Sequence, residues 1–275
     1  GGEGQVLISC LVCAGITKFM PTSVSDGLLL VILLLASVVA GVVWSVIPAI
    51  FKAFFNTNET LFTLMMNYIA IGLVDLFISI WVKNGSQSFG VLKNGRMPDL
   101  FDLQYLWVVI IVAIVTIGMI FYLSKSKQGY EISVVGESQN TARYIGINVK
   151  KVIIRTAIIS GALCGLMGFL LVAGVEHTIN PDLVEGRGFT GVLIAWLGHF
   201  NPYEIILYSS LVGIFKQGST QAATYVNMNS SYFSAIVTGL FFFVIIACEF
   251  FVNYQIKIHH KTKKESQIKG GSQNV

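Results

Sequence analysis

The sequence predicts an all-α, polytopic helical membrane protein with about seven to eight membrane segments. Of its 275 residues, 54% are hydrophobic and only 12% are charged, whereas soluble domains carry about a quarter charged residues. The mean hydropathy is +0.73. The apolar runs are also continuous rather than alternating, which is typical of membrane helices and not of β-barrel strands. Together these observations exclude a soluble globular domain.

The first half of the chain contains a short apolar run and three clear spans. The short run stops at Pro21, and the first clear span stops at Pro48, after which we expect an interfacial turn over Phe51 to Thr60. Proline is expected to end a helix because it lacks the backbone N–H and clashes with the preceding turn. The predicted apolar segments are residues 6–20, 28–47, 61–82 and 105–123.

The second half begins with a span rich in small residues, Val152 to Val175. Gly161, Gly165 and Gly168 fall close to one face of this helix, which predicts close packing against a neighbouring backbone. Two shorter segments follow, residues 189–197 and 203–216, and they form either a re-entrant half-helix with a returning helix or two short spans. A polar stretch over residues 218–231 separates them from the last span, residues 232–254.

A weak internal repeat relates two parts of the chain. The run from Glu3 to Ile8 resembles the run from Gly188 to Ile194, and a proline follows each of them, Pro21 and Pro202. The expected topology starts the two runs from opposite sides of the membrane. Inverted repeats with interrupted helices often frame a central substrate site, so we expect a site near these runs.

The longest polar interval between apolar runs is Ser124 to Lys151, with five cations: Lys125, Lys127, Arg143, Lys150 and Lys151. Short loops rich in lysine and arginine lie on the cytoplasmic side of membranes. We therefore expect this interval to be cytoplasmic, with one short helix over residues 136–147. The intervals 83–104 and 176–188 then lie outside, and the C-terminus lies inside.

These segments predict one transmembrane domain, residues 1–256, and a basic cytoplasmic tail, residues 257–275, that is disordered. The chain opens without Met inside a GGEGQ motif, so we expect residues to be missing upstream. The formal net charge is +4. Its cations sit beside membrane spans, where anionic lipid and topology explain them, and no nucleic-acid partner is expected.

The motifs exclude several kinds of chemistry. No GxxxxGK[ST] phosphate loop is present, so the chain does not itself bind ATP through a P-loop. Cys10 and Cys13 form a CxxC inside an apolar run, where buried thiols are expected rather than a disulfide or a redox site. No metal site and no catalytic residue is predicted, and we expect no enzyme activity and no cofactor bound to this chain.

Polar residues within the spans are the better candidates. Asn67 lies near the middle of its span, and Asp75 lies about two turns further toward the outside. Such residues usually face a cavity or a partner, because lipid cannot hydrogen-bond them. For Asn67 the alternatives are an interhelical hydrogen bond and a place on a solute path. For Asp75 the alternatives are a position that faces a cavity and a position close to the outer membrane interface.

Four motifs carry a family resemblance: GGEGQ at the start, NTNETLFTLMMNYIA at 56–70, GESQNTARYIGINV at 136–149 and EGRGFTGVLIAWLGHFNP at 185–202. Together they resemble the ABC-transporter permeases for branched-chain amino acids and simple sugars, most closely the nucleoside branch. The resemblance implies an importer in a bacterial-type plasma membrane. It would contain a second permease subunit, identical or paralogous, ABC ATPase subunits that hold ATP and Mg, and an extracellular solute-binding lipoprotein.

The resemblance also implies residue roles. The segment that couples to the ATPase matches Gly136, Asn140, Ala142, Arg143 and Gly146, with Thr141 departing from the usual alanine. Candidate residues of the substrate path are Glu3, Gln5, Asn67 and Tyr68. Ribose or simple sugars and branched-chain amino acids are alternative substrates. An ion-coupled secondary transporter is the alternative of another class, and Asp75 is the carboxylate that it would need.

Overall fold

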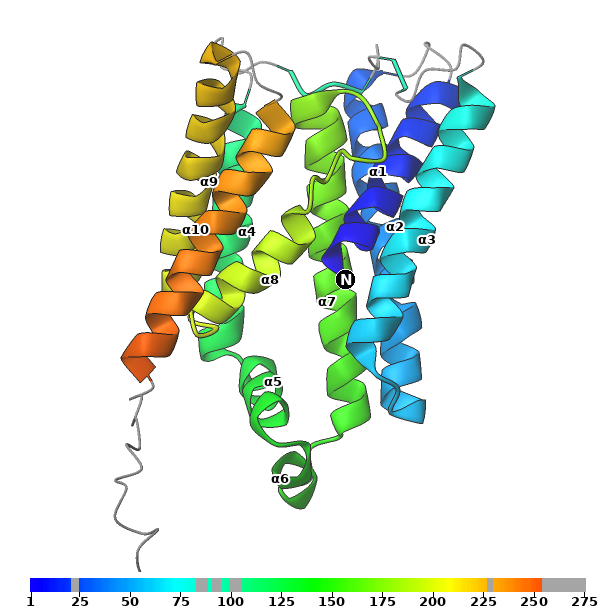
Figure 1. Ribbon diagram of the computed structural model, residues 1–275. Helices are drawn as coiled ribbons and strands as arrows, with labels where there is room; N and C mark the ends of the chain where they lie inside the picture. The colour runs from blue at the N-terminus through cyan, green and yellow to red at the C-terminus, as the bar shows by residue number, and fades with distance from the viewer. Residues whose placement is uncertain (21–24, 83–88, 91–94, 99–104, 227–229, 254–275) are drawn as a thin grey trace, which may run out of the picture. The chain divides into compact units, whose positions relative to one another are not determined.

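The computed structural model describes residues 1–20, 25–82, 89–90, 95–98, 105–226 and 230–253 (Figure 1). These residues are mostly helical, and they divide into two compact units, Gly1–Val192 and Leu193–Val275. Four helices are long and apolar enough to cross a membrane: Asp26–Phe55 (α2), Glu59–Trp81 (α3), Leu106–Lys125 (α4) and Val149–Glu176. The predicted class, a polytopic helical membrane protein, is therefore confirmed.

Helix α1, Gly2–Phe19, is the core of the first unit. It packs against α2, α3 and α7 (Val149–Phe169), and it is buried along most of its length (Figure 1). A helix that is apolar on all sides is stable only when other helices surround it. Cys10 and Cys13 are free thiols inside this core, with no exposed surface. The short first run is thus an internal helix.

Helix α7, Val149–Phe169, packs closely against α2, as its glycine face predicts. A Cβ atom at Gly165 would lie 2.5 Å from the carbonyl oxygen of Ser37, and one at Gly161 would lie 2.6 Å from that of Gly41. The hydroxyl of Ser45 donates to the carbonyl oxygen of Ala157 at 2.8 Å. Because the backbones touch, α2 and α7 behave as one packed pair.

Two helices extend beyond their predicted ends. Helix α2 continues through Pro48 to Phe55, and it ends at Asn56, which adopts a left-handed conformation with φ 51°. Pro48 removes one hydrogen bond from the helix, but breaking the helix would leave more backbone groups unpaired in lipid. The side chain of Asn58 then caps α3 by accepting from the N–H groups of Thr60 and Leu61.

The other extension lies at the end of α7. A π-helix, Leu170–Glu176 (η1), continues α7 up to His177, which is left-handed with φ 52°. Most of η1 is buried against α1 and neighbouring segments. An isolated bridge joins Phe89 to Ile179 just beyond it. The predicted span over residues 152–175 is therefore confirmed and slightly longer.

The second unit contains two long helices. Helix α8, Arg187–Leu197, begins in the first unit and ends in the second, and helix α9, Pro202–Tyr225, follows a cap by Asn201. Helix α10, Ser230–Asn253, packs against α9. The predicted end of the α9 segment at Lys216 was wrong, because the helix continues to Tyr225. The hydroxyls of Ser219, Thr220 and Thr224 donate back to carbonyl oxygens of the preceding turn, so these polar residues fit within the helix.

The lengths of α8 and α9 can be compared with the two arrangements predicted for residues 189–216, a re-entrant half-helix with a returning helix or two short spans. Helix α8 has 11 residues and α9 has 24, about 16 Å and 36 Å. A half-helix followed by a full-length returning helix fits these lengths better than two short spans. The predicted inverted repeat remains a prediction. The predicted tail, residues 257–275, and most of the interval 83–104 lie outside the described residues.

Candidate functional site

Three of the four sequence motifs meet where α1 begins. The backbone N–H of Gly4 donates to Oδ1 of Asn67, from α3, at 2.9 Å. The backbone N–H of Gly186, in the loop before α8, donates to Oε1 of Glu3 at 2.9 Å. The start of α1 thus contacts one residue that is 63 positions away in the sequence and another that is 183 positions away. Asn67 therefore makes an interhelical hydrogen bond, which was one of its two predicted roles.

Two glycines allow this close approach. A Cβ atom at Gly4 would lie 2.8 Å from Oδ1 of Asn67, and one at Gly188 would lie 2.7 Å from the backbone nitrogen of Glu3. A Cβ atom at Gly188 would therefore collide with the backbone of α1, and one at Gly4 would displace the Asn67 side chain from its hydrogen bond. This explains physically why GGEGQ has a glycine at position 4 and why EGRG has one at position 188.

The cluster lies at mid-depth of the first unit. The chain begins about half-way along the length of α7 (Figure 1). Gln5 is only 9% exposed, and its Oε1 atom has no hydrogen-bond partner among the described residues. The Nε1 atom of Trp44 is likewise buried and unpaired there. An acceptor and a donor therefore remain available near the start of α1, where an unpaired polar group is costly.

Trp44 is a residue that the sequence analysis missed. A Cβ atom at Gly4 would lie 3.2 Å from its Nε1 atom, so the indole lies beside the cluster. One signal was present in the sequence. Tryptophan in membrane helices is enriched at the two interfaces, whereas Trp44 lies well inside the long helix α2.

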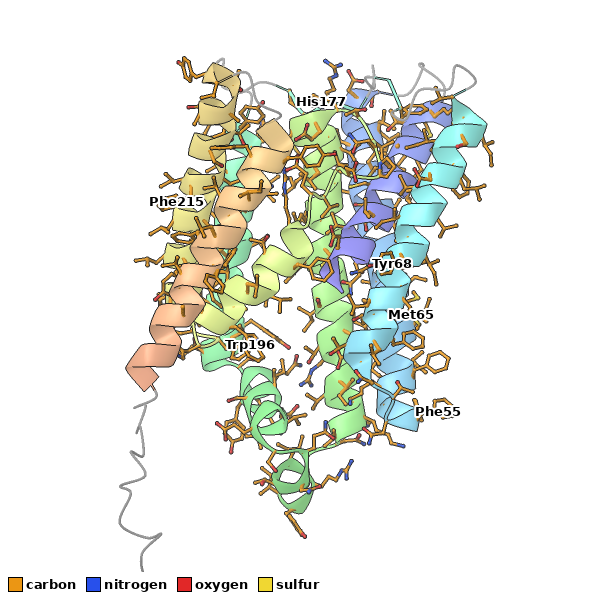
Figure 2. The ribbon with its side chains drawn as sticks, viewed as in Figure 1. Phe55, Met65, Tyr68, His177, Trp196 and Phe215 are labelled. Atoms are coloured by element: carbon orange, nitrogen blue, oxygen red, sulfur yellow. The ribbon has the colours of Figure 1, made fainter. Side chains whose placement is uncertain are left out.

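Tyr68 does not join the other predicted path residues. Its side chain is 74% exposed on the outer surface of α3, where Figure 2 labels it with Met65. Asn67, its neighbour, is 5% exposed. Adjacent residues on a helix point about 100° apart, so one faces the cluster and the other faces away. The structure thus brings together Glu3, Gln5 and Asn67 but not Tyr68.

The predicted coupling segment forms two helices instead of one over residues 136–147. Helix α5 is Lys127–Glu137, so Gly136 belongs to its last turn, and helix α6 is only Gln139–Tyr144. Ser138 causes the break because its backbone is extended, with φ −157°, and its hydroxyl accepts from the N–H of Thr141. Gly146 then turns the chain with φ 84°.

Most of the predicted coupling residues are exposed at one end of the first unit. Helix α5 lies beside one end of α7, and α6 lies beyond that end (Figure 1). Gly136, Asn140, Arg143 and Gly146 are exposed, whereas Ala142 has no exposed surface. Tyr144 beside them is 92% exposed. Ala142 therefore anchors α6, and the tip of α6 presents Arg143 and Tyr144 outward.

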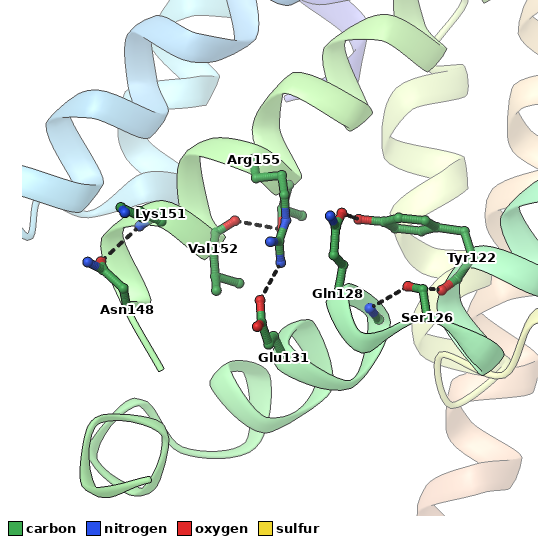
Figure 3. Close-up of polar contacts among 10 residues, drawn as sticks. Tyr122, Ser126, Gln128, Glu131, Asn148, Lys151, Val152 and Arg155 are labelled. Carbon is green, nitrogen blue, oxygen red and sulfur yellow. Dashed lines mark hydrogen bonds and ion pairs between the residues drawn. The ribbon is translucent and has the colours of Figure 1, made fainter. Parts of the chain in front are cut away.

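Two contacts hold α5 to the spans, and a third joins two of those spans near it. Nη2 of Arg155, on α7, lies 2.9 Å from Oε2 of Glu131, on α5 (Figure 3). The hydroxyl of Tyr122 donates to Oε1 of Gln128 at 2.8 Å and ties α4 to α5. Nζ of Lys150 lies 4.8 Å from the ring centroid of Phe54, at the end of α2. Helix α5 is thus linked to α4 and α7, and the Lys150–Phe54 contact joins the start of α7 to the end of α2.

Comparison with known proteins identifies the family to which this chain belongs. The sequence model of the branched-chain amino acid transport system permease component matches residues 1–246. The chain belongs to this permease family. The family consists of transport components that are not enzymes, and it implies no cofactor on this chain. Among the described residues, no group of three or more histidine, cysteine, aspartate or glutamate residues is placed to hold a metal ion.

The chain is also similar to three named ABC transporter permeases. The guanosine ABC transporter permease of Bacillus subtilis is 31% identical over 80% of this chain. The nucleoside ABC transporter permease NupB of Lactococcus lactis is 25% identical over 87%, and the glucose ABC transporter permease of Haloferax volcanii is 25% identical over 94%. This chain spans 65% of the length of the guanosine permease and 71% of the other two. No solved structure matches it significantly.

Proposed function

We propose that the chain is the permease subunit of an ATP-driven importer that carries nucleosides across the plasma membrane. The observation that supports this most is the family match over residues 1–246, combined with two relatives that are named for guanosine and nucleosides. Its partners would be ABC ATPase subunits that hold ATP and Mg, a second permease subunit and an extracellular solute-binding lipoprotein. The C-terminus and helices α5 and α6 would face the cytoplasm.

The coupling role rests on the exposed tip of α6. Arg143 and Tyr144 would dock on the ATPase, while the buried Ala142 keeps α6 attached. A displacement of α6 and α5 would pass to α7 through the Glu131–Arg155 ion pair. Packed elements move as rigid bodies rather than deforming continuously, so the force applied at one end would move the spans.

The packing of α7 gives this motion a route to the polar cluster. Helices α2 and α7 touch along their glycine faces and would move together. Gly168 of α7 lies against α1, since a Cβ atom there would lie 2.7 Å from Cβ of Ser9. The start of α1, with Glu3 and Gln5, would therefore respond to movement of α6.

The solute would pass by alternating access. The proposed path residues are Glu3, Gln5 and Asn67 at the buried start of α1, and Tyr68 on another, exposed side of α3. Amide side chains supply both donors and acceptors, which suit ribose hydroxyls and base edges. The unpaired Oε1 of Gln5 is an acceptor of this kind. A weakly selective path would suffice, because the binding lipoprotein can select the solute.

A glucose-type substrate is the second candidate, because the glucose permease of Haloferax volcanii aligns with 94% of this chain. Ribose and glucose both present hydroxyl groups, so the cluster does not separate the two. A branched-chain amino acid would instead bring two charges into the path, and none of the three relatives described above is named for one.

The decisive experiment is uptake in vesicles that contain the full permease, its ATPase subunits and its binding protein. Labelled guanosine, glucose and leucine would be supplied in parallel, with ATP or with a non-hydrolysable analogue inside. We expect accumulation of guanosine that requires hydrolysable ATP. Accumulation driven by an ion gradient without the ATPase would refute the proposal, and accumulation of glucose alone would favour the second candidate.

A further inference from the structure

We propose that one face of α3 lines a water-filled path for a neutral or cationic polar solute instead of facing lipid. This polar face consists of Tyr68, Gly72, Asp75 and Ser79. The inference rests on the proposed function, since it assigns a surface to the path. From the sequence, Tyr68 is expected on the path, whereas Asp75 is expected to face either a cavity or the outer interface.

The four residues share one side of the helix. At 100° per residue they fall within an arc of about 60°. All four are exposed, and Tyr68 is 74% exposed. A Cβ atom at Gly72 would meet nothing within 4 Å, so the surface is open there. The buried side of α3, with Asn67, Ala70, Val74 and Ile78, faces the core of the first unit.

Asp75 is the main reason to infer that this face of α3 does not contact lipid. It lies five residues from the midpoint of α3, Glu59–Trp81, which is about 7 Å along the axis. The hydrocarbon core extends about 15 Å on either side of its centre. Among the described residues, no side chain pairs with the Asp75 carboxylate. The nearby hydroxyl of Ser79 donates to the backbone oxygen of Asp75 and not to its carboxylate. Carboxylates at this depth normally face a cavity or a partner.

Helix α2 provides the contrast within the same unit. Its exposed side is entirely aliphatic in the middle of the span, with Val31, Leu35, Val39 and Val43 each more than half exposed. That composition suits acyl chains. Helix α3 also exposes aliphatic side chains, among them Ile69, Leu76 and Ile80. Beside them, however, its polar face carries a carboxylate, a phenol and a hydroxyl, which the exposed residues in the middle of α2 do not supply.

The chemistry of the polar face indicates what would pass. Carboxylate, phenol and serine oxygens accept hydrogen bonds from the hydroxyl and amino groups of a nucleoside or sugar. The negative charge of Asp75 would repel phosphates and other anions. The face therefore suits neutral or cationic solutes and not nucleotides.

Cysteine accessibility tests the inference without measuring transport. Gly72→Cys and Ser79→Cys would be made in the full permease, assembled with its partners in membranes, with Leu35→Cys and Val39→Cys as matched controls. All four sites are exposed, so the variants should fold like the parent chain. Labelling by a charged, membrane-impermeant methanethiosulfonate would be measured above the background of the parent cysteines.

We expect Gly72→Cys and Ser79→Cys to react at least about tenfold faster than the two α2 controls. A cationic reagent should react faster than an anionic one at Gly72→Cys, because Asp75 lies one turn away. The additional change Asp75→Asn should remove that preference. Excess guanosine, but not leucine, should slow the labelling.

Two results would overturn the inference. If the α3 and α2 sites label equally, the polar face has no special access to water. If Gly72→Cys instead cross-links between two permease subunits without reacting with the reagent, the face is a dry subunit contact. A failure of the proposed function is a separate result: the parent complex would show no ATP-dependent uptake, while α3 would still label.

Discussion

Arg155 and Glu131 form an ion pair across α7 and α5, with 2.9 Å between Nη2 and Oε2, and both side chains are mostly buried. This pair joins the exposed α5–α6 segment to a helix that reaches the core. The two residues are 24 positions apart, and the sequence analysis assigned neither a role.

The first prediction concerns this ion pair. Arg155→Glu places two carboxylates side by side, and we expect it to lower ATP-dependent uptake at least about fivefold. The stability cost should be about 1–3 kcal/mol, between the values for exposed and buried pairs. The exchange Glu131→Arg with Arg155→Glu should restore more than half of the uptake. Uptake per ATP hydrolysed is the measurement, and equal ratios in all variants would show that the pair transmits nothing.

A second prediction concerns the glycine face between α2 and α7. Gly165→Leu would push a side chain into the backbone of Ser37 and Val38, where even a Cβ atom would lie 2.5–2.6 Å from backbone atoms. We expect a loss of at least about 3 kcal/mol, because the helices must separate. Thermal unfolding in detergent measures it. The control is Gly118→Ala on α4, where a Cβ atom meets nothing within 4 Å and stability should not fall.

Asn67 provides a third prediction. Asn67→Ala leaves the buried N–H of Gly4 without its acceptor, which should cost about 1–3 kcal/mol. Met65→Ala on the same helix is the control, because Met65 is 67% exposed. Unfolding temperature and guanosine uptake should both fall for Asn67→Ala only. Equal stability of the two variants would mean that the hydrogen bond does not hold α1 to α3.

The coupling segment provides a fourth prediction. Gly136→Pro removes a backbone N–H from the last turn of α5 and should disrupt it at a cost of about 3 kcal/mol. We expect insertion into the membrane to persist while uptake is lost. Gly136→Ala fits without contact and should keep uptake. If the proline variant still binds the ATPase and transports, α5 has no part in coupling.

Arg143→Glu tests docking at the tip of α6. Arg143 is exposed, so reversing its charge should leave folding unchanged while weakening the ATPase contact. Co-purification of the ATPase with the permease is the measurement, and we expect recovery to fall at least about threefold. Lys127→Glu, on the neighbouring helix, is the charge-matched control. Unchanged recovery for Arg143→Glu would remove this residue from the docking surface.

The positions of the helices were largely predictable because hydropathy is a local property of the chain. The spans over residues 61–82, 105–123 and 152–175 correspond closely to α3, α4 and the helix formed by α7 and η1. The errors were in the positions of helix ends. Pro48 was predicted to end a helix but lies within α2, and Ser138 was predicted within one helix but separates α5 from α6. Both depend on which backbone hydrogen bonds compete at one residue, and a hydropathy pattern does not contain that information.

The sequence by itself determined the membrane class, the family and the glycine face of α7, whereas the structure identified α2 as the helix that packs on this face. Only the tertiary structure decided that Glu3, Gln5 and Asn67 meet, that Tyr68 faces away from them, and that Glu131 pairs with Arg155. The reason is physical. Inside a membrane, lipid and protein neighbours are almost equally apolar, so the pattern of apolar residues shows where a helix runs but not which of its faces meets a partner.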